Sequence, residues 1–287
     1  MNRLATWPKL SGASTPIDAV ARPVTQDYSA ITELPGSAAT GEQLARLYHR
    51  YHTASLHARG RRVLEVACGP GLGLGYLTRT ARLVVGGDYT ASVLRMAQAH
   101  YQGRIPLLRL DAHHLPFSDR AFDLLVVFEA IYYLADAERF VAEARRVLDT
   151  NGTLLLCTVN REWREFSPSS FSTRYYSVPG LRGLLVNEGF THLEFFGAFP
   201  TSAVSLKQEA VRAVRRIASA FHLVPKTLSG RESLKRLFYG PLVAIKPEIE
   251  DGVAEPYPLV GIPADVPNME YKIIYALGRN GAPHYRS

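Results

Sequence analysis

The chain has 287 residues, of which 47% are hydrophobic and 21% charged, and its formal net charge is +7. This composition is ordinary for a globular protein, and the length suits one large domain or one domain with a sizeable insertion. It argues against a transmembrane helix, because no run of about 20 apolar residues occurs, and the N-terminus lacks the apolar core of a signal peptide. The two cysteines, Cys68 and Cys157, form neither a disulfide framework nor a metal-type spacing. We therefore expect no metal site and a cytoplasmic location.

Strands and helices alternate through most of the chain. After a loose N-terminal arm of about 25 residues, a cap helix is predicted over residues 40–57. Strands are then predicted over 62–67, 82–87, 106–111, 122–129, 153–159, 192–196 and 271–277, and helices over 72–80, 91–101, 135–148 and 178–188. This alternation indicates an α/β fold, in which a seven-stranded, mostly parallel sheet is covered by helices on both faces.

The longest gap between predicted strands holds an insertion, residues 199–270, just before the last strand. Connections between adjacent strands are normally short. The basic excess lies here, because residues 203–247 contain nine Lys or Arg and two Asp or Glu, whereas the rest of the chain contains 24 of each sign. The chain therefore divides into an N-terminal arm and cap helix (1–58), a core (59–198 and 271–287) and a basic, partly helical insertion (199–270).

A glycine-rich turn follows the first strand of the predicted sheet, in the sequence VLEVACGPGLG from residue 63 to residue 73. Glycine has no Cβ and tolerates positive φ, so such a turn lets the backbone approach a ligand, and the next helix directs its N–H groups there. The glycines at 69, 71, 73 and 75 do not fit the G-x-G-x-x-G dinucleotide fingerprint, and no Gly-Lys-Ser/Thr follows to make a P-loop.

Acidic residues end the next strands. Asp88 follows the first glycine by about twenty residues, where an acid can accept hydrogen bonds from a ribose diol. Asp111 ends the third strand, in the sequence LDAHHLPF. Each of the two could instead cap the helix that follows, and both roles can coexist. Glu129 ends the fourth strand and opens the sequence EAIYYL.

With these motifs in this order, the chain resembles the class I S-adenosylmethionine-dependent methyltransferases from about residue 62 to residue 159 and again in the final strand. The resemblance implies a Rossmann-like fold, S-adenosyl-L-methionine as cofactor and S-adenosyl-L-homocysteine as product. It also implies a set of cofactor contacts. These are backbone approach at Gly69 and Gly71, ordering of that loop and of the cofactor's amino group by Glu65, ribose binding by Asp88, adenine contacts from Tyr89, Asp111 and Ala112, backbone of Phe128 near the methionine part, and Tyr28 as an N-terminal aromatic over the cofactor.

The same resemblance places the methyl acceptor beside Glu129. Some relatives that methylate hydroxyls carry Glu-x-x-x-His after the fourth strand, with the histidine close to the acceptor. Here Tyr133 takes the histidine position, which argues against a histidine base at that site. Glu129, Tyr132 and Tyr133 are the candidate catalytic residues, and packing against the following helix is an equal alternative for the two tyrosines.

Three segments should roof the acceptor pocket: the N-terminal helix, the insertion and the loop over residues 160–177. That loop combines several aromatic residues with serines and an arginine, which suits a small organic acceptor; an ordinary surface loop is the equal alternative. His49 and His52 on the cap helix are expected at the surface rather than in the pocket.

These features predict methyl transfer to an oxygen or nitrogen of a small molecule, such as a specialised metabolite or a sugar or glycan precursor. If the basic insertion forms a lid, it favours an anionic acceptor, although a charge run is usually a solvated helix face. One alternative is a nucleic-acid methyltransferase, which the basic charge fits but the fourth-strand motif does not. The other is docking of residues 205–237 on an anionic membrane or another protein. The oligomeric state is left open.

Overall fold

The computed structural model describes residues 27–169, 171–201 and 242–281. The predicted N-terminal arm and the basic segment 205–237 therefore lie outside the described residues. None of the helices in the described ranges has the length and apolar character needed to cross a bilayer.

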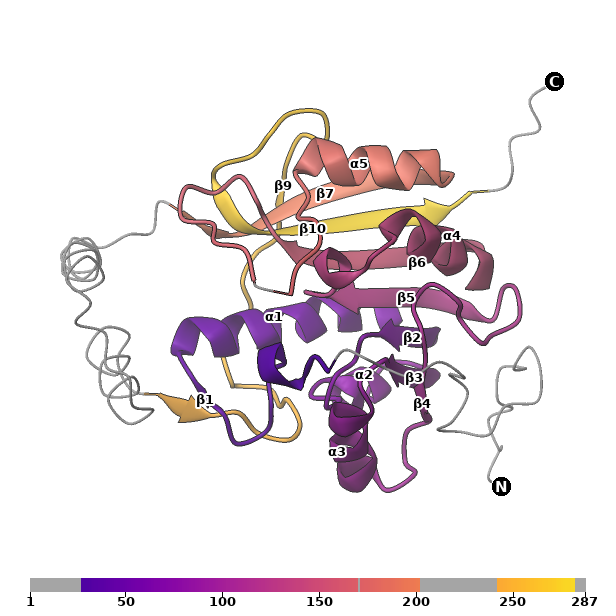
Figure 1. The fold of residues 1–287 in the computed structure, drawn as a ribbon, viewed down its shortest axis with the longest axis vertical. Coiled ribbons are helices and arrows are strands. Elements are labelled where there is room, and N and C mark those ends of the chain that lie inside the picture. The colour runs from indigo at the N-terminus through magenta and orange to yellow at the C-terminus, as the bar shows by residue number, and fades with distance from the viewer. Residues whose placement is uncertain (1–26, 170, 202–241, 282–287) are drawn as a thin grey trace.

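A mixed sheet of eight strands forms the centre of the molecule, in the order β4-β3-β2-β5-β6-β10-β7-β9 (Figure 1). The strands are β2 (Arg62–Val66), β3 (Leu83–Asp88), β4 (Leu107–Arg109), β5 (Phe122–Phe128), β6 (Leu148–Val159), β7 (Phe190–Pro200), β9 (Val260–Gly261) and β10 (Tyr271–Asn280). Strands β2 to β6 pair in parallel, and β10 runs antiparallel between β6 and β7. All seven predicted strands are present. The number seven was too low by one, because β9 is a two-residue edge strand too short to leave a pattern in the sequence.

Helices cover both faces of this sheet, as predicted. They are α1 (Gly41–Ala58), α2 (Leu74–Thr78), α3 (Ala91–Tyr101), α4 (Ala137–Val147) and α5 (Val178–Asn187). Helix α1 begins with a capping box, in which Thr40 and Gln43 each bond the other's backbone N–H. Figure 1 shows the sheet extending from β4, near α3, to β7, near α5.

The two faces of the sheet carry separate apolar cores. Helices α4 and α5 pack on one of them, with Phe140 and Leu181, and α1, α2 and α3 pack on the other, with Leu47 and Leu94. Neighbouring residues of a strand alternate between the two, so Leu125 of β5 joins the first core and Leu124 the second. Burial on both faces explains why these strands are continuous apolar runs.

The described end of the insertion packs against the face that carries α1. Strand β8 (Val243–Ala244) pairs antiparallel with β1 (Ala38–Ala39). Farther on, the Ile249 N–H donates to the Leu72 carbonyl (2.8 Å), and Asp251 accepts from Tyr76 (2.8 Å) and Arg79 (2.6 Å). Residues 242–251 therefore fasten the N-terminal segment, α1 and α2 to one another.

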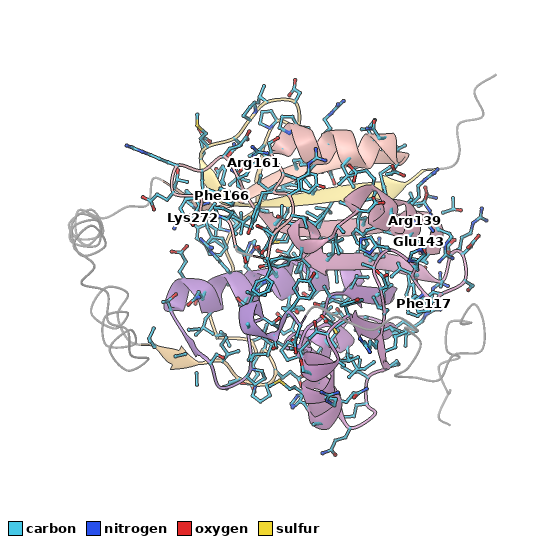
Figure 2. All side chains as sticks on the ribbon, viewed as in Figure 1. Phe117, Arg139, Glu143, Arg161, Phe166 and Lys272 are labelled. Carbon is cyan, nitrogen blue, oxygen red and sulfur yellow. The ribbon has the colours of Figure 1, made fainter. Side chains whose placement is uncertain are left out.

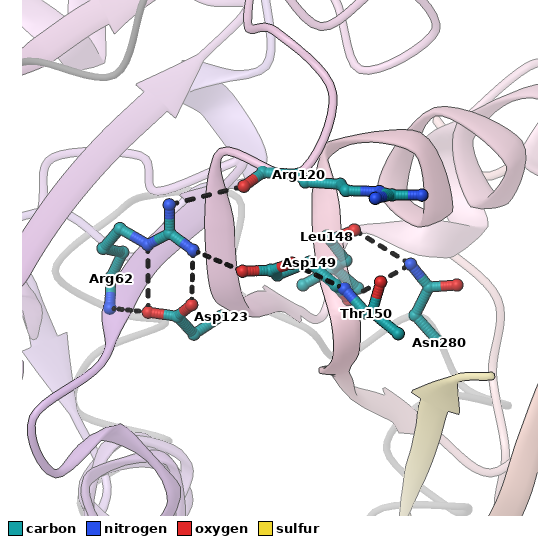
Figure 3. A network of polar contacts seen from close by, with 7 residues as sticks. All are labelled: Arg62, Arg120, Asp123, Leu148, Asp149, Thr150 and Asn280. Atoms are coloured by element: carbon teal, nitrogen blue, oxygen red, sulfur yellow. Dashed lines mark hydrogen bonds and ion pairs between the residues drawn. The ribbon is translucent and has the colours of Figure 1, made fainter. Parts of the chain in front are cut away.

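An ion-pair network joins β2, β5 and β6 at the amino ends of these parallel strands (Figure 3). Arg62 of β2 donates to both carboxylate oxygens of Asp123 and, at 2.9 Å, to Asp149. Asn280 of β10 donates to the main-chain carbonyls of Leu148 (2.8 Å) and Asp149 (3.2 Å). Because this network lies at the amino ends of the parallel strands, it supports the fold and leaves the carboxyl ends free for the site.

We expect the Asp123→Asn variant to lower the free energy of unfolding by about 1–2 kcal/mol, because the paired hydrogen bonds to the Arg62 guanidinium cannot all be replaced by a neutral amide. Urea denaturation measures this loss. Asp119→Asn is the control, since Asp119 also pairs with an arginine, Arg146, but has a side chain that is 74% exposed, and its loss should stay below about 0.5 kcal/mol. Equal effects of the two changes would contradict the assignment.

Candidate active site

A cavity of about 550 Å³ opens at the carboxyl ends of β2, β3, β4 and β5. Its walls come from the residues that end these strands, and α1 together with residues 28–33 closes it from the N-terminal side. It is lined by eleven of the twelve residues predicted to contact cofactor or acceptor: Tyr28, Glu65, Gly69, Asp88, Tyr89, Asp111, Ala112, Phe128, Glu129, Tyr132 and Tyr133. Parallel strands place their carboxyl ends at one edge of the sheet, and this brings together residues that are far apart in the sequence.

Gly71 is the predicted residue that does not line the cavity. Its φ is +77°, and a Cβ there would lie 3.0 Å from the Tyr101 ring and 3.1 Å from Ala97. The Tyr101 hydroxyl also donates to the Gly71 carbonyl (2.7 Å). Gly71 thus allows the turn to pack on α3, whereas Gly69, with φ +55°, faces the cavity.

Asp88 ties the glycine-rich turn to the end of β3. Its Oδ2 accepts the Gly69 N–H (2.8 Å) and its Oδ1 accepts the Thr90 N–H (2.7 Å). Burial raises the pKa of this carboxyl, while the two N–H donors oppose that rise. Asp88 does not cap the helix that follows, because the N-cap of α3 is Thr90 and no side chain caps it. Asp88 instead braces the turn and also lines the cavity.

Asp111 lies at the edge of the cavity beside two histidines. Its Oδ1 accepts the His113 N–H (2.9 Å) and lies 2.6 Å from His113 Nδ1, and its Oδ2 lies 3.6 Å from His114 Nδ1. Burial acts to raise its pKa, but the hydrogen bonds from His113 outweigh burial, and the net pKa is lowered. Asp111 is therefore held as a carboxylate, and His113 also lines the cavity.

Glu65 is a buried acid at the end of β2. The Tyr51 hydroxyl of α1 donates to its Oε1 (2.7 Å), and its Oε2 has no hydrogen-bond partner among the residues described. Burial raises its pKa to about 8, against the opposing hydrogen bond from Tyr51. An orphaned buried oxygen is costly, so Glu65 is suited to hold a cationic group of a ligand.

Glu129 lines the cavity just after the end of β5. Its backbone conformation is strained, with φ +51°. Non-glycine residues in the left-handed region occur most often at functional sites. Its N–H donates to the Cys157 carbonyl (2.8 Å), and its Oε2 accepts the Tyr132 hydroxyl (3.0 Å). Burial raises the Glu129 pKa, and the positive charge of Arg50 opposes that rise. A buried carboxyl with a raised pKa, lining a cavity, is a candidate for proton transfer.

Comparison with known proteins agrees with this geometry. Residues 64–156 match a methyltransferase domain family. A probable S-adenosylmethionine-dependent methyltransferase of Mycobacterium tuberculosis is 32% identical over 155 residues, which is 52% of this chain and 56% of that protein. Phthiotriol/phenolphthiotriol dimycocerosates methyltransferase 1 of Mycobacterium ulcerans is 39% identical over 110 residues, 37% of this chain and 41% of that protein. The chain thus spans about half the length of the curated relatives it matches.

The fold comparison points the same way. The crystal structure of a methyltransferase from Thermotoga maritima, described as a possible histamine N-methyltransferase, has a TM-score of 0.54 at 16% identity and covers 83% of this chain and 92% of its own. Residues 64–156 form a methyltransferase domain of the class I S-adenosylmethionine-dependent type. The cofactor of this family is S-adenosylmethionine.

The side chains that line the cavity offer hydrogen-bond acceptors suited to that cofactor. The orphaned Oε2 of Glu65 offers an acceptor for an ammonium group, and Gly69 lines the same cavity. At the other side, Asp88 and Asp111 place two carboxylates at the ends of neighbouring strands, where hydroxyl and amino donors of a nucleoside can reach them.

Tyr132 and Tyr133 both pack on other aromatic rings and also line the cavity. Tyr132 stacks on Tyr175 of the loop over 160–177 (centroids 4.4 Å apart), and Tyr133 packs on Tyr28 (5.7 Å). Tyr28 in turn meets Phe171 (6.3 Å), so the N-terminal segment and the loop close over the rim together. These ring contacts are with the loop and the N-terminal segment rather than with the following helix, and both tyrosines also line the cavity.

The loop over 160–177 only partly roofs the cavity. Phe171 and Thr173 line it, but Phe166 packs on Tyr175 toward the outer end of the sheet, where Figure 2 shows it with Arg161 and Lys272. Thus the loop contributes a rim, and its remaining aromatic residues anchor it to the protein.

The cap helix α1 lies over the cavity, as expected, but sequence reasoning did not name the side chains that it contributes and misplaced one of its histidines. Gln43, Arg46, Leu47, Arg50 and Tyr51 line the methyltransferase cavity. The only signal was the presence of charged residues among the apolar positions of a predicted helix. His49, expected at the surface, is 1% exposed, with its ring between the Tyr275 hydroxyl (2.6 Å) and the Tyr257 carbonyl (2.9 Å). The surface prediction for His49 was wrong because both partners come from more than 200 residues away.

Proposed function

We propose that this protein transfers the methyl group of S-adenosylmethionine to an oxygen or nitrogen of a small organic molecule, with a hydroxyl oxygen favoured. The observation that carries this proposal is one cavity that is lined by Glu65, Asp88 and Asp111 at the ends of β2, β3 and β4 and by Glu129 at the end of the neighbouring strand β5. The first three suit the amino, ribose and adenine groups of the cofactor. Glu129 then lies where the acceptor must enter.

A hydroxyl acceptor is favoured because it must lose a proton as it is methylated. When bound, S-adenosylmethionine supplies a methyl group on a positively charged sulfur. The acceptor oxygen forms the new O–CH₃ bond as the S–CH₃ bond breaks, and the bonding pair stays on sulfur. Glu129 takes the hydroxyl proton, and Tyr132 holds the carboxyl in place through its hydrogen bond to Oε2. The aromatic rim of Tyr28, Tyr133 and Phe171 helps to align the two reactants and limits the access of water.

The relatives support an acceptor with an apolar body. Several carry names that specify phthiotriol or phenolphthiotriol dimycocerosates, and the rim here is formed by Tyr28, Tyr133 and Phe171. An aromatic rim suits a largely apolar molecule, and Glu129 offers a base for one reactive hydroxyl. The proposed acceptor is therefore a small or lipid-like alcohol or phenol.

Two measurements test the proposal. Calorimetric titration of the full chain with S-adenosyl-L-homocysteine should show binding at one site per chain. The protein is then incubated with S-adenosylmethionine and panels of small alcohols, phenols and amines. S-adenosyl-L-homocysteine should form with at least one alcohol or phenol. Absence of binding would contradict the cofactor assignment, and turnover with amines alone would contradict the preference for oxygen.

Cofactor binding should also depend on pH through Glu65. Its pKa of about 8 means that the free protein holds this carboxyl protonated at neutral pH. An ammonium group binds the ionised form, so binding should release a proton, and the contribution of Glu65 should increase as the pH rises toward about 8. Calorimetry near pH 7 in buffers of different ionisation enthalpy measures that proton.

The Glu65→Gln variant is the control, because it cannot release the proton. Tyr51→Phe removes a hydrogen bond that lowers the Glu65 pKa, so its affinity should approach the wild-type value only at higher pH. Identical proton release by the wild type and by Glu65→Gln would exclude Glu65 from the site.

A further inference from the structure

Arg50 is a buried arginine in the wall of the cavity that the proposed function has not used. It lies on α1, is 7% exposed and lines the cavity. Its Nη2 pairs with Glu33, while its Nε has no acceptor among the residues described. A buried donor without a partner costs free energy, so the position of this side chain calls for an explanation other than stability.

The ion pair with Glu33 does not supply that explanation. The Glu33 side chain is 37% exposed, whereas that of Arg50 is 9% exposed. Water can solvate Glu33 without any partner, and an ion pair that requires burial of its arginine contributes little net stability. The burial of Arg50 is therefore not required by Glu33.

The charges around Arg50 show which part of the cavity it serves. Its positive charge lowers the pKa values of Glu65 and of Glu129, in both cases against the larger effect of burial. It therefore lies within electrostatic reach of both ends of the cavity. Arg46, one turn earlier on the same face of α1, also lines the cavity and also has an Nε without a partner among the residues described.

We propose that Arg50 is the anion receptor of this cavity and binds a carboxylate between the Gly69 turn and Glu129. This inference rests on the proposed function. A guanidinium group offers two parallel N–H donors that match a carboxylate. A dianionic phosphate fits poorly, because Glu33, Glu65 and Glu129 surround the same space. The carboxylate can come from two sources, the methionine part of the cofactor or the acceptor.

Glu33 then acts as the internal counter-ion of the free protein. It pairs with one nitrogen of Arg50 and competes with an incoming carboxylate for the same positive charge. Removing the charge of Glu33 should therefore strengthen carboxylate binding, whereas removing the charge of Arg50 should weaken it. A purely structural ion pair would not give effects of opposite sign.

The test compares two nucleosides that differ in the carboxylate. S-adenosyl-L-homocysteine carries the amino-acid part, and 5′-methylthioadenosine lacks it. If the source is the cofactor, Arg50→Met should weaken binding of the first by about 10- to 100-fold, the range for charge-assisted hydrogen bonds, and leave the second within about twofold. Glu33→Gln should raise the affinity for the first nucleoside only, and Arg50→Lys should recover part of the loss because it keeps the charge.

Controls separate this effect from damage to the fold. The affinity ratio of the two nucleosides is measured within each variant, so partial unfolding cancels. Arg59→Met changes an exposed arginine at the end of the same helix and should leave the ratio unchanged. The double variant Glu33→Gln/Arg50→Met removes both charges together, and it should keep the low ratio of Arg50→Met with a melting temperature closer to that of the wild type.

If Arg50→Met leaves the ratio unchanged, benzoate and hexanoate are titrated into protein saturated with S-adenosyl-L-homocysteine. Binding to the wild type but not to Arg50→Met would assign the carboxylate to the acceptor. An unchanged ratio together with no Arg50-dependent binding of these acids overturns the proposal. Failure of the wild type to bind either nucleoside is a different result, which removes the proposed function and this assignment with it.

Discussion

In the Asp88→Ala variant, we expect the affinity for S-adenosyl-L-homocysteine to fall by about 100-fold or more, because hydrogen bonds to a charged group are among the stronger ones in proteins. Asp88 is proposed to bind the ribose hydroxyls, and it also holds the Gly69 N–H at 2.8 Å. Its removal therefore takes away a ligand contact and releases the turn that faces the cavity. Isothermal titration calorimetry measures the loss.

Two further variants show which role accounts for the loss. Asp88→Asn keeps one acceptor oxygen for a backbone N–H and should retain more of the fold's stability than Asp88→Ala. Asp265→Ala removes an exposed acid far along the chain from the site and should not change the affinity. If Asp88→Ala melts at a lower temperature but binds S-adenosyl-L-homocysteine as the wild type does, Asp88 only braces the turn.

The periodicity of the sequence was sufficient to predict the sheet and the end at which the site lies. Strands such as β5 are apolar on both faces, and an acid or glycine follows them where the strand leaves the sheet. Because parallel strands share one carboxyl edge, Glu65, Asp88, Asp111 and Glu129 had to converge once the strand order was right. Their convergence in one cavity confirms that the pattern specified the neighbourhood of each residue.

What the sequence could not show was which side chains of α1 face that neighbourhood. Arg46, Arg50 and Tyr51 share the helix with His49, and only the docking angle of the helix decides which of them reaches the cavity. That angle is set by contacts with residues far away in the chain, such as the bond from His49 to Tyr275. Local spacing carries no record of such contacts, so the buried Arg50 and His49 emerge only from the structure.

Gly71 shows a related limit. A glycine at positive φ beside a predicted binding turn can serve a ligand or a neighbouring helix, and both need the missing Cβ. The sequence cannot separate the two, because the neighbours that a Cβ would strike, Tyr101 and Ala97, belong to another element.

The second large effect is expected at Glu129. For a hydroxyl acceptor, Glu129→Gln should lower kcat by about 10²- to 10⁴-fold, the usual contribution of a general base, and leave the affinity for S-adenosyl-L-homocysteine within about threefold. A glutamine keeps the shape and accepts the Tyr132 hydrogen bond, but it cannot take a proton. The burial that raises the Glu129 pKa also predicts that the wild-type rate rises with pH, since the base is active only when ionised. Single-turnover kinetics at saturating acceptor measures both effects.

Tyr132→Phe separates the base from its support. It removes the hydrogen bond to Glu129 Oε2 that acts against the raised pKa of the carboxyl, so the ascending limb of the pH–rate profile should move to higher pH while the plateau rate falls only modestly. A neutral amine acceptor needs no base, and Glu129→Gln should then change kcat by less than about tenfold. The size of the Glu129→Gln effect therefore reports the atom that is methylated, and a small effect on a confirmed hydroxyl acceptor would show that the proton leaves by another route.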